Sequence, residues 1–172
     1  MRLERDNLVI RQAVIADAPL LGNWWRDGQI MAHAGFPLGL DISDEEIAES
    51  VATGEGLLIL EIDAMPAGEM SYRSKGTKTA QIGIKICDFS QQGKGYGAKL
   101  LDMLIYELFV NLDFEKIILD TNLNNRRAQK IYKNLGFRRT GILLDSWENQ
   151  LGELQSSIEY ELIKDEYVGF CD

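Results

Sequence analysis

The sequence predicts an α/β domain with a mostly antiparallel sheet, and three features of the chain lead to this prediction. The first is a series of strand-like segments, with apolar and polar residues in strict alternation at residues 80–87. The second is a polar, glycine-rich segment, residues 88–97, that opens an amphipathic helix. The third is a later succession of a strand, a helix and two strands. Because 172 residues is the length of one domain, we expect a single domain over residues 1–172.

The amino-terminal part of the chain contains one predicted strand and two predicted helices. The strand covers residues 8–13, and leucines and tryptophans at helical spacing indicate a helix over residues 16–26. A loop with glycine and proline, residues 33–41, follows. A Ser-x-x-Glu capping box that starts at Ser43 then predicts a second helix over residues 44–53.

The remaining elements follow from the same two periodicities. Further strands are predicted at residues 56–62, 67–72, 80–87, 115–121, 137–144 and 156–164. Two more helices lie between them. One begins at the glycine-rich segment, and the other is capped by Asn125 and ends at Gly136.

Composition and charge exclude several classes of protein. Hydrophobic residues make up 45% of the chain and charged residues 26%, as in an ordinary globular protein. The formal charge of −9 argues against a nucleic-acid partner. No apolar run is long enough to cross a membrane and no signal segment is recognisable, so we expect a cytoplasmic protein without a membrane partner. Two distant cysteines, Cys87 and Cys171, and one histidine predict neither a disulfide framework nor a metal site.

Residues 91–97, with three glycines at alternate positions, predict a phosphate or pyrophosphate site. Glycines let backbone N–H groups turn toward one point, and the helix that begins there adds the positive end of its dipole. A Walker loop is excluded because no serine or threonine follows Lys94. A dinucleotide fingerprint fits loosely, as Gly93-x-Gly95-x-x-Ala98. A turn that only caps the helix is the third interpretation.

Two motifs in this chain resemble those of the GCN5-related N-acetyltransferases, the GNAT family. They are Gln92-x-x-Gly95-x-Gly97 and Asn122-x-x-Asn125-x-Arg127-Ala128-x-x-x-Tyr132-x-x-x-Gly136-Phe137. The resemblance covers residues 8–167 and is strongest to the branch with ribosomal-protein alanine, spermidine and some aminoglycoside acetyltransferases. It implies one N-acetyltransferase domain. Its sheet of about seven strands would be flanked by four helices and would splay between the fourth and fifth strands.

The resemblance also implies how acetyl-CoA is held. Backbone N–H groups of the loop would bind the pyrophosphate, and these belong to Gln92, Gly93, Lys94, Gly95, Tyr96 and Gly97. The pantetheine arm would pair with the fourth strand at Lys85, Ile86 and Cys87, where an N–H near Cys87 would polarise the thioester carbonyl. Asn125 would bond the pantetheine arm, and Tyr132 would be the general acid that protonates the departing thiolate.

The implied acceptor is a primary amine that attacks the thioester directly, either a peptide or protein N-terminal α-amine or a small polyamine-like molecule. An aminoglycoside is the alternative acceptor, and a non-catalytic CoA-binding module is the alternative class. The general base is unassigned, because the fourth strand offers Gln81 and Lys85 where related enzymes often carry a glutamate. Glu69 on the preceding strand is a candidate base, but an ordinary exposed carboxylate is the preferred interpretation. The resemblance allows a homodimer, for which the sequence has no distinct signal.

The resemblance also implies that substrate selection falls to residues 25–43 and 145–155. Aromatic candidates for an acceptor pocket are Trp24, Trp25, His33, Phe36 and Trp147, although core packing is the commoner fate of such residues. Acidic candidates for attracting a cationic substrate are Asp41, Asp145 and Glu148.

Overall fold

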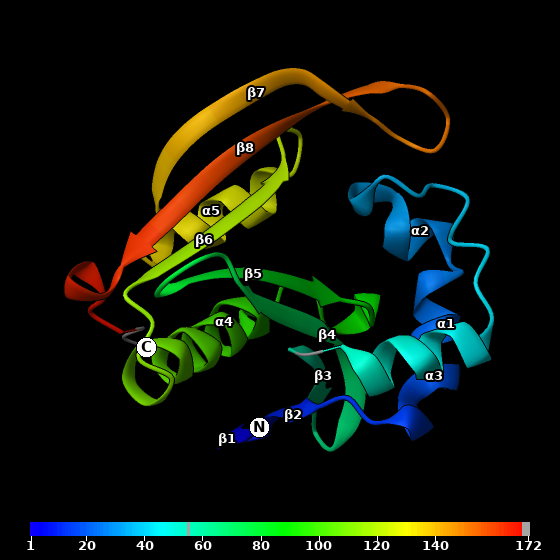
Figure 1. Cartoon of the computed structure of the whole chain (residues 1–172), viewed down its shortest axis with the longest axis horizontal. Coiled ribbons are helices and arrows are strands. Elements are labelled where there is room, and N and C mark those ends of the chain that lie inside the picture. Colours follow the sequence, from blue (N-terminus) through cyan, green and yellow to red (C-terminus); the bar gives the residue numbers. More distant parts are fainter. Residues whose placement is uncertain (55, 170–172) are drawn as a thin grey trace.

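The computed structural model describes residues 1–54 and 56–169, and an eight-stranded sheet runs through this part of the chain (Figure 1). The strands are β1 (Arg2–Arg5), β2 (Leu8–Gln12), β3 (Leu57–Ile62), β4 (Met65–Ser74), β5 (Thr79–Ile86), β6 (Lys116–Asn122), β7 (Arg138–Glu148) and β8 (Leu154–Ile163). Their order in the sheet is β1-β2-β3-β4-β5-β6-β8-β7. Only β5 and β6 are parallel neighbours, and every other pair is antiparallel.

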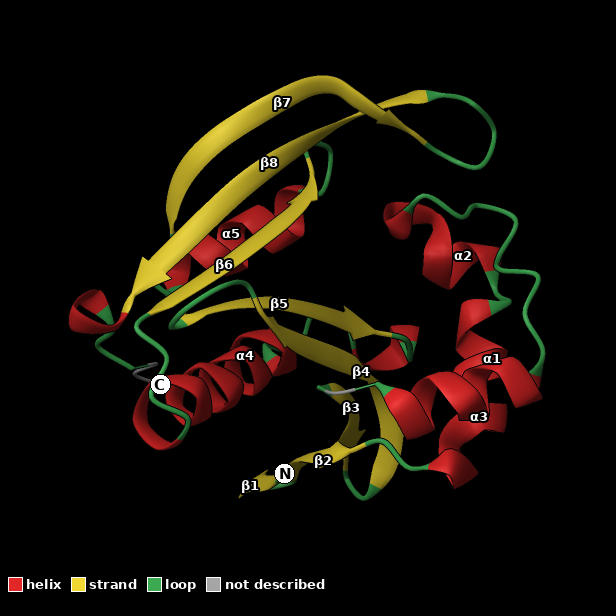
Figure 2. Ribbon diagram, viewed as in Figure 1, coloured by secondary structure: helices red, strands yellow, loops and turns green. Residues whose placement is uncertain are grey.

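Five α-helices surround the sheet in the described residues (Figure 2). They are α1 (Ala18–Trp25), α2 (Gly28–Met31), α3 (Asp44–Thr53), α4 (Tyr96–Tyr106) and α5 (Arg126–Asn134). The Ser43 hydroxyl accepts from the Glu46 N–H and the Glu46 carboxylate accepts from the Ser43 N–H, which is the predicted capping box of α3. None of these helices is long and apolar enough to cross a membrane.

The predicted fold class is confirmed, with one more strand and one more helix than expected. The additional strand is β1, which a tight turn at Asp6 (φ 53°) folds back onto β2. The additional helix is α2, whose first N–H groups are capped by the Asp27 carboxylate. Of the residues named in the sequence, Cys171 lies outside the described part of the chain.

Two apolar clusters hold helices on opposite faces of the sheet. In β3, Leu58 and Leu60 belong to the main core with α4, while Ile59 packs with α1 and α3. This alternation follows from the two-residue period of a strand, and it buries the middle of β3 on both faces. Figure 1 shows α4 and the group α1–α3 on opposite sides of β3 and β4.

The predicted splay lies between β5 and β6 and is confirmed. The two strands pair only at their beginnings, from Thr79 opposite Lys116 to Gln81 opposite Ile118. Beyond that point β5 stays paired with β4 and β6 stays paired with β8, so the facing edges of the two strands separate (Figure 1). The sheet is therefore open in its middle, between the second halves of β5 and β6.

Candidate active site

A cavity of about 930 Å³ lies where β5 and β6 separate. Its walls come from the end of β5, the glycine-rich loop, the first turn of α4, the end of β6 and one side of α5, with residues of α2 at the far end. Nine of the eleven predicted site residues line it: Lys85, Ile86, Gln92, Gly93, Gly95, Tyr96, Gly97, Asn125 and Tyr132. The two that do not are Cys87 and Lys94.

The glycine-rich loop offers a run of main-chain N–H groups without a protein acceptor. Gly93 and Gly95 have φ of 80° and 85°, a backbone conformation that favours glycine. Within the described residues, the N–H groups of residues 93–97 make no hydrogen bond, whereas Ala98 N–H already donates to the Gly95 carbonyl. The Gln92 N–H is also engaged, with the Phe89 carbonyl at 3.2 Å. The unpaired run is therefore residues 93–97 rather than the predicted 92–97, because Gln92 still belongs to the preceding turn.

The side chain of Gln92 braces the loop between β5 and α5. Its Nε2 donates to the Ile86 carbonyl at 2.9 Å, and its Oε1 accepts from Arg127 Nη1 at 2.9 Å. Arg127, which the sequence marked only as part of a motif, also lines the cavity. In contrast, Lys94 Nζ donates to Gln91 Oε1 of its own loop at 3.2 Å on an exposed surface. Gln92 and Arg127 together fix the loop at the mouth of the splay.

The open edge of β5 belongs to Ile84 and Ile86 rather than to Lys85 and Cys87. The Cys87 N–H donates to the Ala67 carbonyl of β4 at 2.8 Å. Backbone groups alternate in direction along an antiparallel pair, so those of residue 85 also face β4 and those of Ile84 and Ile86 face the splay. The Cys87 N–H is therefore already engaged, and the Ile86 N–H next to it is the group at the edge. Burial raises the pKa of the Cys87 thiol to about 12, so this thiol is no nucleophile at neutral pH.

Tyr132 presents a protonated hydroxyl to the cavity. The residue is 6% exposed, and its ring packs against the rings of Tyr160 and Phe137 at centroid distances of 5.5 and 6.0 Å. Burial raises its pKa, and the nearby charge of Asp120 raises it further. The hydroxyl makes no hydrogen bond with another described residue. It can therefore donate a proton to a group bound in the cavity.

Asn125 positions the helix that carries Tyr132. Its Oδ1 accepts from the Ala128 N–H at 3.2 Å, which is the predicted cap of α5, and its Nδ2 donates to Thr121 Oγ1 at 3.3 Å. The end of β6 also contributes Asp120, Thr121 and Asn122 to the lining. The sequence reasoning assigned none of them to the site and marked Asn122 only as the start of the second motif. Their place beside the splay and directly before Asn125 was the signal that could have identified them.

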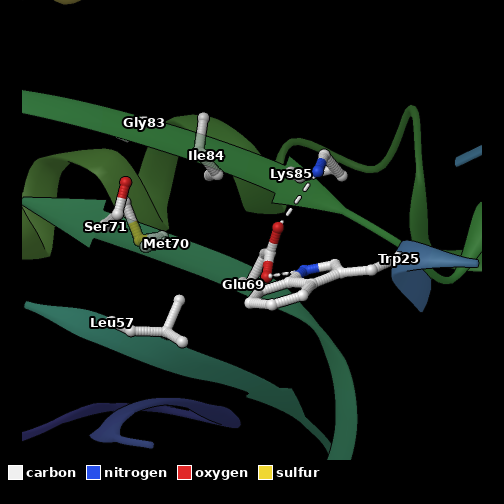
Figure 3. A pocket seen from close by; sticks show the side chains of 8 residues that line it. All are labelled: Trp25, Leu57, Glu69, Met70, Ser71, Gly83, Ile84 and Lys85. Carbon is white, nitrogen blue, oxygen red and sulfur yellow. Dashed lines mark hydrogen bonds and ion pairs between the residues drawn. The ribbon is translucent and has the colours of Figure 1, made fainter. Parts of the chain in front are cut away.

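A second, smaller cavity of about 310 Å³ adjoins the first along β5 (Figure 3). Both cavities are lined by Gly83, Ile84 and Lys85. In the small cavity Glu69 Oε1 lies 3.0 Å from Lys85 Nζ, and Glu69 Oε2 accepts from Trp25 Nε1 at 2.7 Å. The expectation of an exposed Glu69 was wrong. Its side chain is 13% exposed, because Lys85 stands opposite it in the sheet and the Trp25 ring covers it.

The aromatic candidates for an acceptor pocket divide between site and core. His33 and Trp147 line the large cavity and Trp25 lines the small one. Trp24 is buried in the core beside α3, and Phe36 lines neither cavity. The acidic candidates also line neither cavity: Asp41, Asp145 and Glu148. Among residues 1–54 and 56–169, no group of three or more His, Cys, Asp or Glu side chains is placed to hold a metal ion.

The tip of the β7–β8 hairpin is fastened to the segment that follows α2. The Gln150 N–H donates to the Gly35 carbonyl at 2.7 Å, and its side-chain amide bonds the Leu38 N–H and the Gly39 carbonyl at 2.9 and 3.0 Å. The Trp147 ring lies against Gly35, where a Cβ would stand 2.5 Å from the ring. The two segments expected to select the substrate are thus joined to each other beside the cavity. Figure 2 shows the hairpin reaching toward α2.

Known proteins share this sequence pattern and this fold. Residues 7–138 match the family model described as the acetyltransferase (GNAT) domain. A Bacillus licheniformis protein named "Uncharacterized N-acetyltransferase p20" is 23% identical over 178 residues, which is 97% of this chain and 98% of that protein. Both comparisons extend well beyond the two motifs.

Two solved structures with bound coenzyme A have the same fold. Spermidine N-acetyltransferase from Vibrio cholerae, in complex with CoA and spermine, superimposes with a TM-score of 0.83 at 20% identity, over 95% of this chain and 99% of that one. RimL, a ribosomal L7/L12 α-N-protein acetyltransferase in complex with coenzyme A, superimposes with a TM-score of 0.82 at 17% identity, over 95% of this chain and 98% of that one. At these identities the likeness concerns the fold. The family match covers well over half of the sequence, and the chain therefore belongs to the GNAT family of acetyl-CoA-dependent acetyltransferases.

Proposed function

We propose that this chain transfers the acetyl group of acetyl-CoA to a primary amine, which attacks the thioester directly. The observation that carries the proposal is a run of five main-chain N–H groups, residues 93–97, that have no acceptor in the described part of the chain and lie beside the cavity that Tyr132 lines. The cavity thus brings together donors that suit a diphosphate and a hydroxyl that suits a departing thiol. The acceptor is a peptide α-amine or a small amine, and an aminoglycoside is the alternative.

The residues present fit the donor. The N–H groups of residues 93–97 and the positive end of α4 would bind the pyrophosphate, with Arg127 and Lys130 as cations on the same cavity wall. The backbone groups of Ile84 and the Ile86 N–H, which face the splay, would pair with the amides of the pantetheine arm, while the Ile86 carbonyl already accepts from Gln92 Nε2. Asn125 lines this part of the cavity and would bond the arm while it caps α5.

The chemistry follows from two donors at the acetyl end. The Ile86 N–H donates to the carbonyl oxygen as negative charge develops there during attack by the amine nitrogen, and this bond strengthens as the charge grows. As the new C–N bond forms, the C–S bond breaks and the sulfur takes the proton of Tyr132. The amine releases its own proton to water, and the tyrosine is protonated again from solvent. Atoms and charges balance as amide plus free thiol.

A purified preparation tests the proposal with two measurements. Acetyl-CoA is expected to raise the melting temperature clearly more than NAD at the same concentration. Both ligands carry a diphosphate, but only acetyl-CoA has a pantetheine arm that would pair with the edge of β5. Thiol release with a panel of amines, with mass spectrometry of the products, is expected to show one acetyl group added per thiol. Stabilisation without turnover on any amine would favour the non-catalytic CoA-binding module instead. Equal stabilisation by NAD would favour the dinucleotide interpretation.

Replacing Gln150 by Ala is expected to raise the KM for the acceptor about fivefold and to leave the KM for acetyl-CoA unchanged. The substitution removes two side-chain hydrogen bonds that join the hairpin to the segment after α2, each worth about 1 kcal/mol, and so loosens the acceptor side alone. Initial rates with each substrate varied in turn measure both constants. Leu151→Ala, an exposed change in the same turn, is the control. A rise confined to the KM for acetyl-CoA would show that the Gln150 contacts support binding of the donor instead.

A further inference from the structure

The Glu69–Lys85 ion pair stands at the junction of the two cavities. Glu69 on β4 and Lys85 on β5 are direct cross-strand partners, and both are largely covered, with side chains 13% and 24% exposed. Lys85 lines both cavities, whereas Glu69 lines only the small one. Figure 3 shows the pair at one end of the small cavity, with Trp25 fixing the far oxygen of the carboxylate. A molecule in the small cavity would therefore meet both charges at once.

Both members of the pair retain unused hydrogen-bonding capacity. Each Glu69 oxygen accepts one bond, from Lys85 Nζ or from Trp25 Nε1, and has a further lone pair. Lys85 Nζ has three N–H groups, and its only hydrogen-bond partners among residues 1–54 and 56–169 are Glu69 Oε1 and the weakly accepting sulfur of Met31, at 3.0 Å each. A negative acceptor and a positive donor thus lie 3.0 Å apart at the edge of an open cavity.

The charge of the pair decides which amines suit it. No third charged side chain lines the small cavity among the described residues, so its net charge is zero. A polyamine would bring several positive charges to one carboxylate that Lys85 already neutralises, and its second charge would be repelled. A molecule with an α-amino carbonyl unit, N–Cα–C=O, can place its amine at Glu69 and its carbonyl oxygen at Lys85.

The rest of the small cavity is mainly apolar. Trp25, Leu57 and Ile84 line it. Gly83 also lines it and adds no side chain, and a Cβ at this position would stand only 3.2 Å from Ser71 Oγ. Such walls suit an uncharged side chain. Building on the proposed acetyl transfer, we infer that this cavity binds the α-amino carbonyl unit of a peptide amino terminus with an uncharged first side chain. Glu69 holds the amine, and Lys85 holds the adjacent carbonyl oxygen.

The proton balance of the acceptor agrees with this assignment. Both Glu69 oxygens already accept a hydrogen bond, from Trp25 Nε1 and from Lys85 Nζ, so in this account the amine releases its proton to water. At pH 7 about a tenth of an α-amine is neutral, because its pKa is about 8, against roughly four in ten thousand of an alkylamine with a pKa of about 10.4. An α-amine therefore needs no strong base at β5, which carries Lys85 and no glutamate.

The test compares two acceptors that differ only in the carbonyl. Leucinamide and 3-methylbutylamine share a side chain, and spermidine represents the polyamines. Initial rates of thiol release give kcat/KM, which is divided by the neutral fraction of each amine to remove the difference in acidity. The wild-type protein is expected to prefer leucinamide at least tenfold over both others, the effect of one hydrogen bond from a charged donor. Equal or better use of 3-methylbutylamine or spermidine overturns the inference while leaving acetyl transfer intact.

Two variants assign the roles. Lys85→Met is expected to bring the ratio of leucinamide to 3-methylbutylamine close to one, and Glu69→Gln is expected to lower kcat/KM for both amines. Lys78→Met is the matched control, since it also breaks an ion pair, with Asp113, but lies away from both cavities. A leucinamide preference that survives Lys85→Met contradicts the assignment. If a variant does not fold, the wild-type comparison alone decides, and thiol release with none of the three amines removes the proposed function together with the inference.

Discussion

Replacing Tyr132 by Phe is expected to lower kcat by about 10²–10⁴-fold and to leave the affinity for acetyl-CoA within about twofold. The hydroxyl is the only part of the side chain that changes, and the ring keeps its packing against Tyr160 and Phe137. Without the hydroxyl, the sulfur must leave as a thiolate inside a largely buried site, where an unsolvated charge is costly. Single-turnover rates of thiol release and calorimetric titration with acetyl-CoA measure the two quantities.

Tyr160→Phe is the matched control for this prediction. Tyr160 is as buried as Tyr132 and packs against its ring, but it does not line the cavity. Its loss of a hydroxyl is expected to leave kcat unchanged within about twofold. Equal effects of the two substitutions, or no effect of Tyr132→Phe, would remove Tyr132 from the role of acid.

The pH profile of the wild-type protein gives an independent check on Tyr132. Burial raises its pKa above the ordinary value of 10, and a tyrosine hydroxyl is protonated below its pKa. The acid is therefore present in its active form from neutral pH up to about pH 10, and kcat is expected not to fall over this interval. An alkaline fall in kcat with a midpoint near 8 or 9, in a protein that stays folded, would indicate a different acid.

Replacing Gly95 by Val is expected to weaken acetyl-CoA binding about 10²-fold. Gly95 has a φ of 85° at the cap of α4, a conformation that a β-branched residue rarely adopts. The loop must rearrange, and N–H groups of residues 93–97 turn away from a common point. Bonds from these groups to a diphosphate are charge-assisted and worth about 1.5–3 kcal/mol each, so loss of one or two accounts for the expected effect. Titration calorimetry measures it.

Gly76→Val separates this effect from loss of stability. Gly76 has a φ of 75°, and a Cβ at either glycine would meet no atom within 4 Å, so the backbone strain is the same and the space is equally open. Gly76 lies in the turn between β4 and β5, away from the cavity. The melting temperature is expected to fall by a similar amount in both variants, whereas only Gly95→Val is expected to weaken acetyl-CoA binding. Similar affinity losses in both would mean that the loop has no special part in binding.

The helices and the glycine loop were predictable from the sequence because their signals are local. The capping box at Ser43 predicted the start of α3, and the cap at Asn125 predicted the start of α5. The loop was recognised because glycine at Gly93 and Gly95 reports directly on backbone conformation. Both motifs therefore pointed to residues that the structure does bring into one cavity.

The features that the sequence did not predict depend on pairing between distant segments. β1 is a short strand of mostly exposed residues that is defined only by its hydrogen bonds with β2. The direction of the Cys87 N–H depends on its register with β4, and a shift of one residue would have turned it to the open edge. In the same way Glu69 resembles an exposed residue until its partners Lys85 and Trp25 are known.

The binding of the donor's diphosphate by the glycine loop is tested most directly by a crystal structure of the protein grown with coenzyme A. The account predicts the two phosphate groups within about 2.7–3.2 Å of main-chain nitrogens of residues 93–97, with the thiol end between β5 and β6. Phosphates bound at another surface, with these nitrogens facing only solvent, would contradict it.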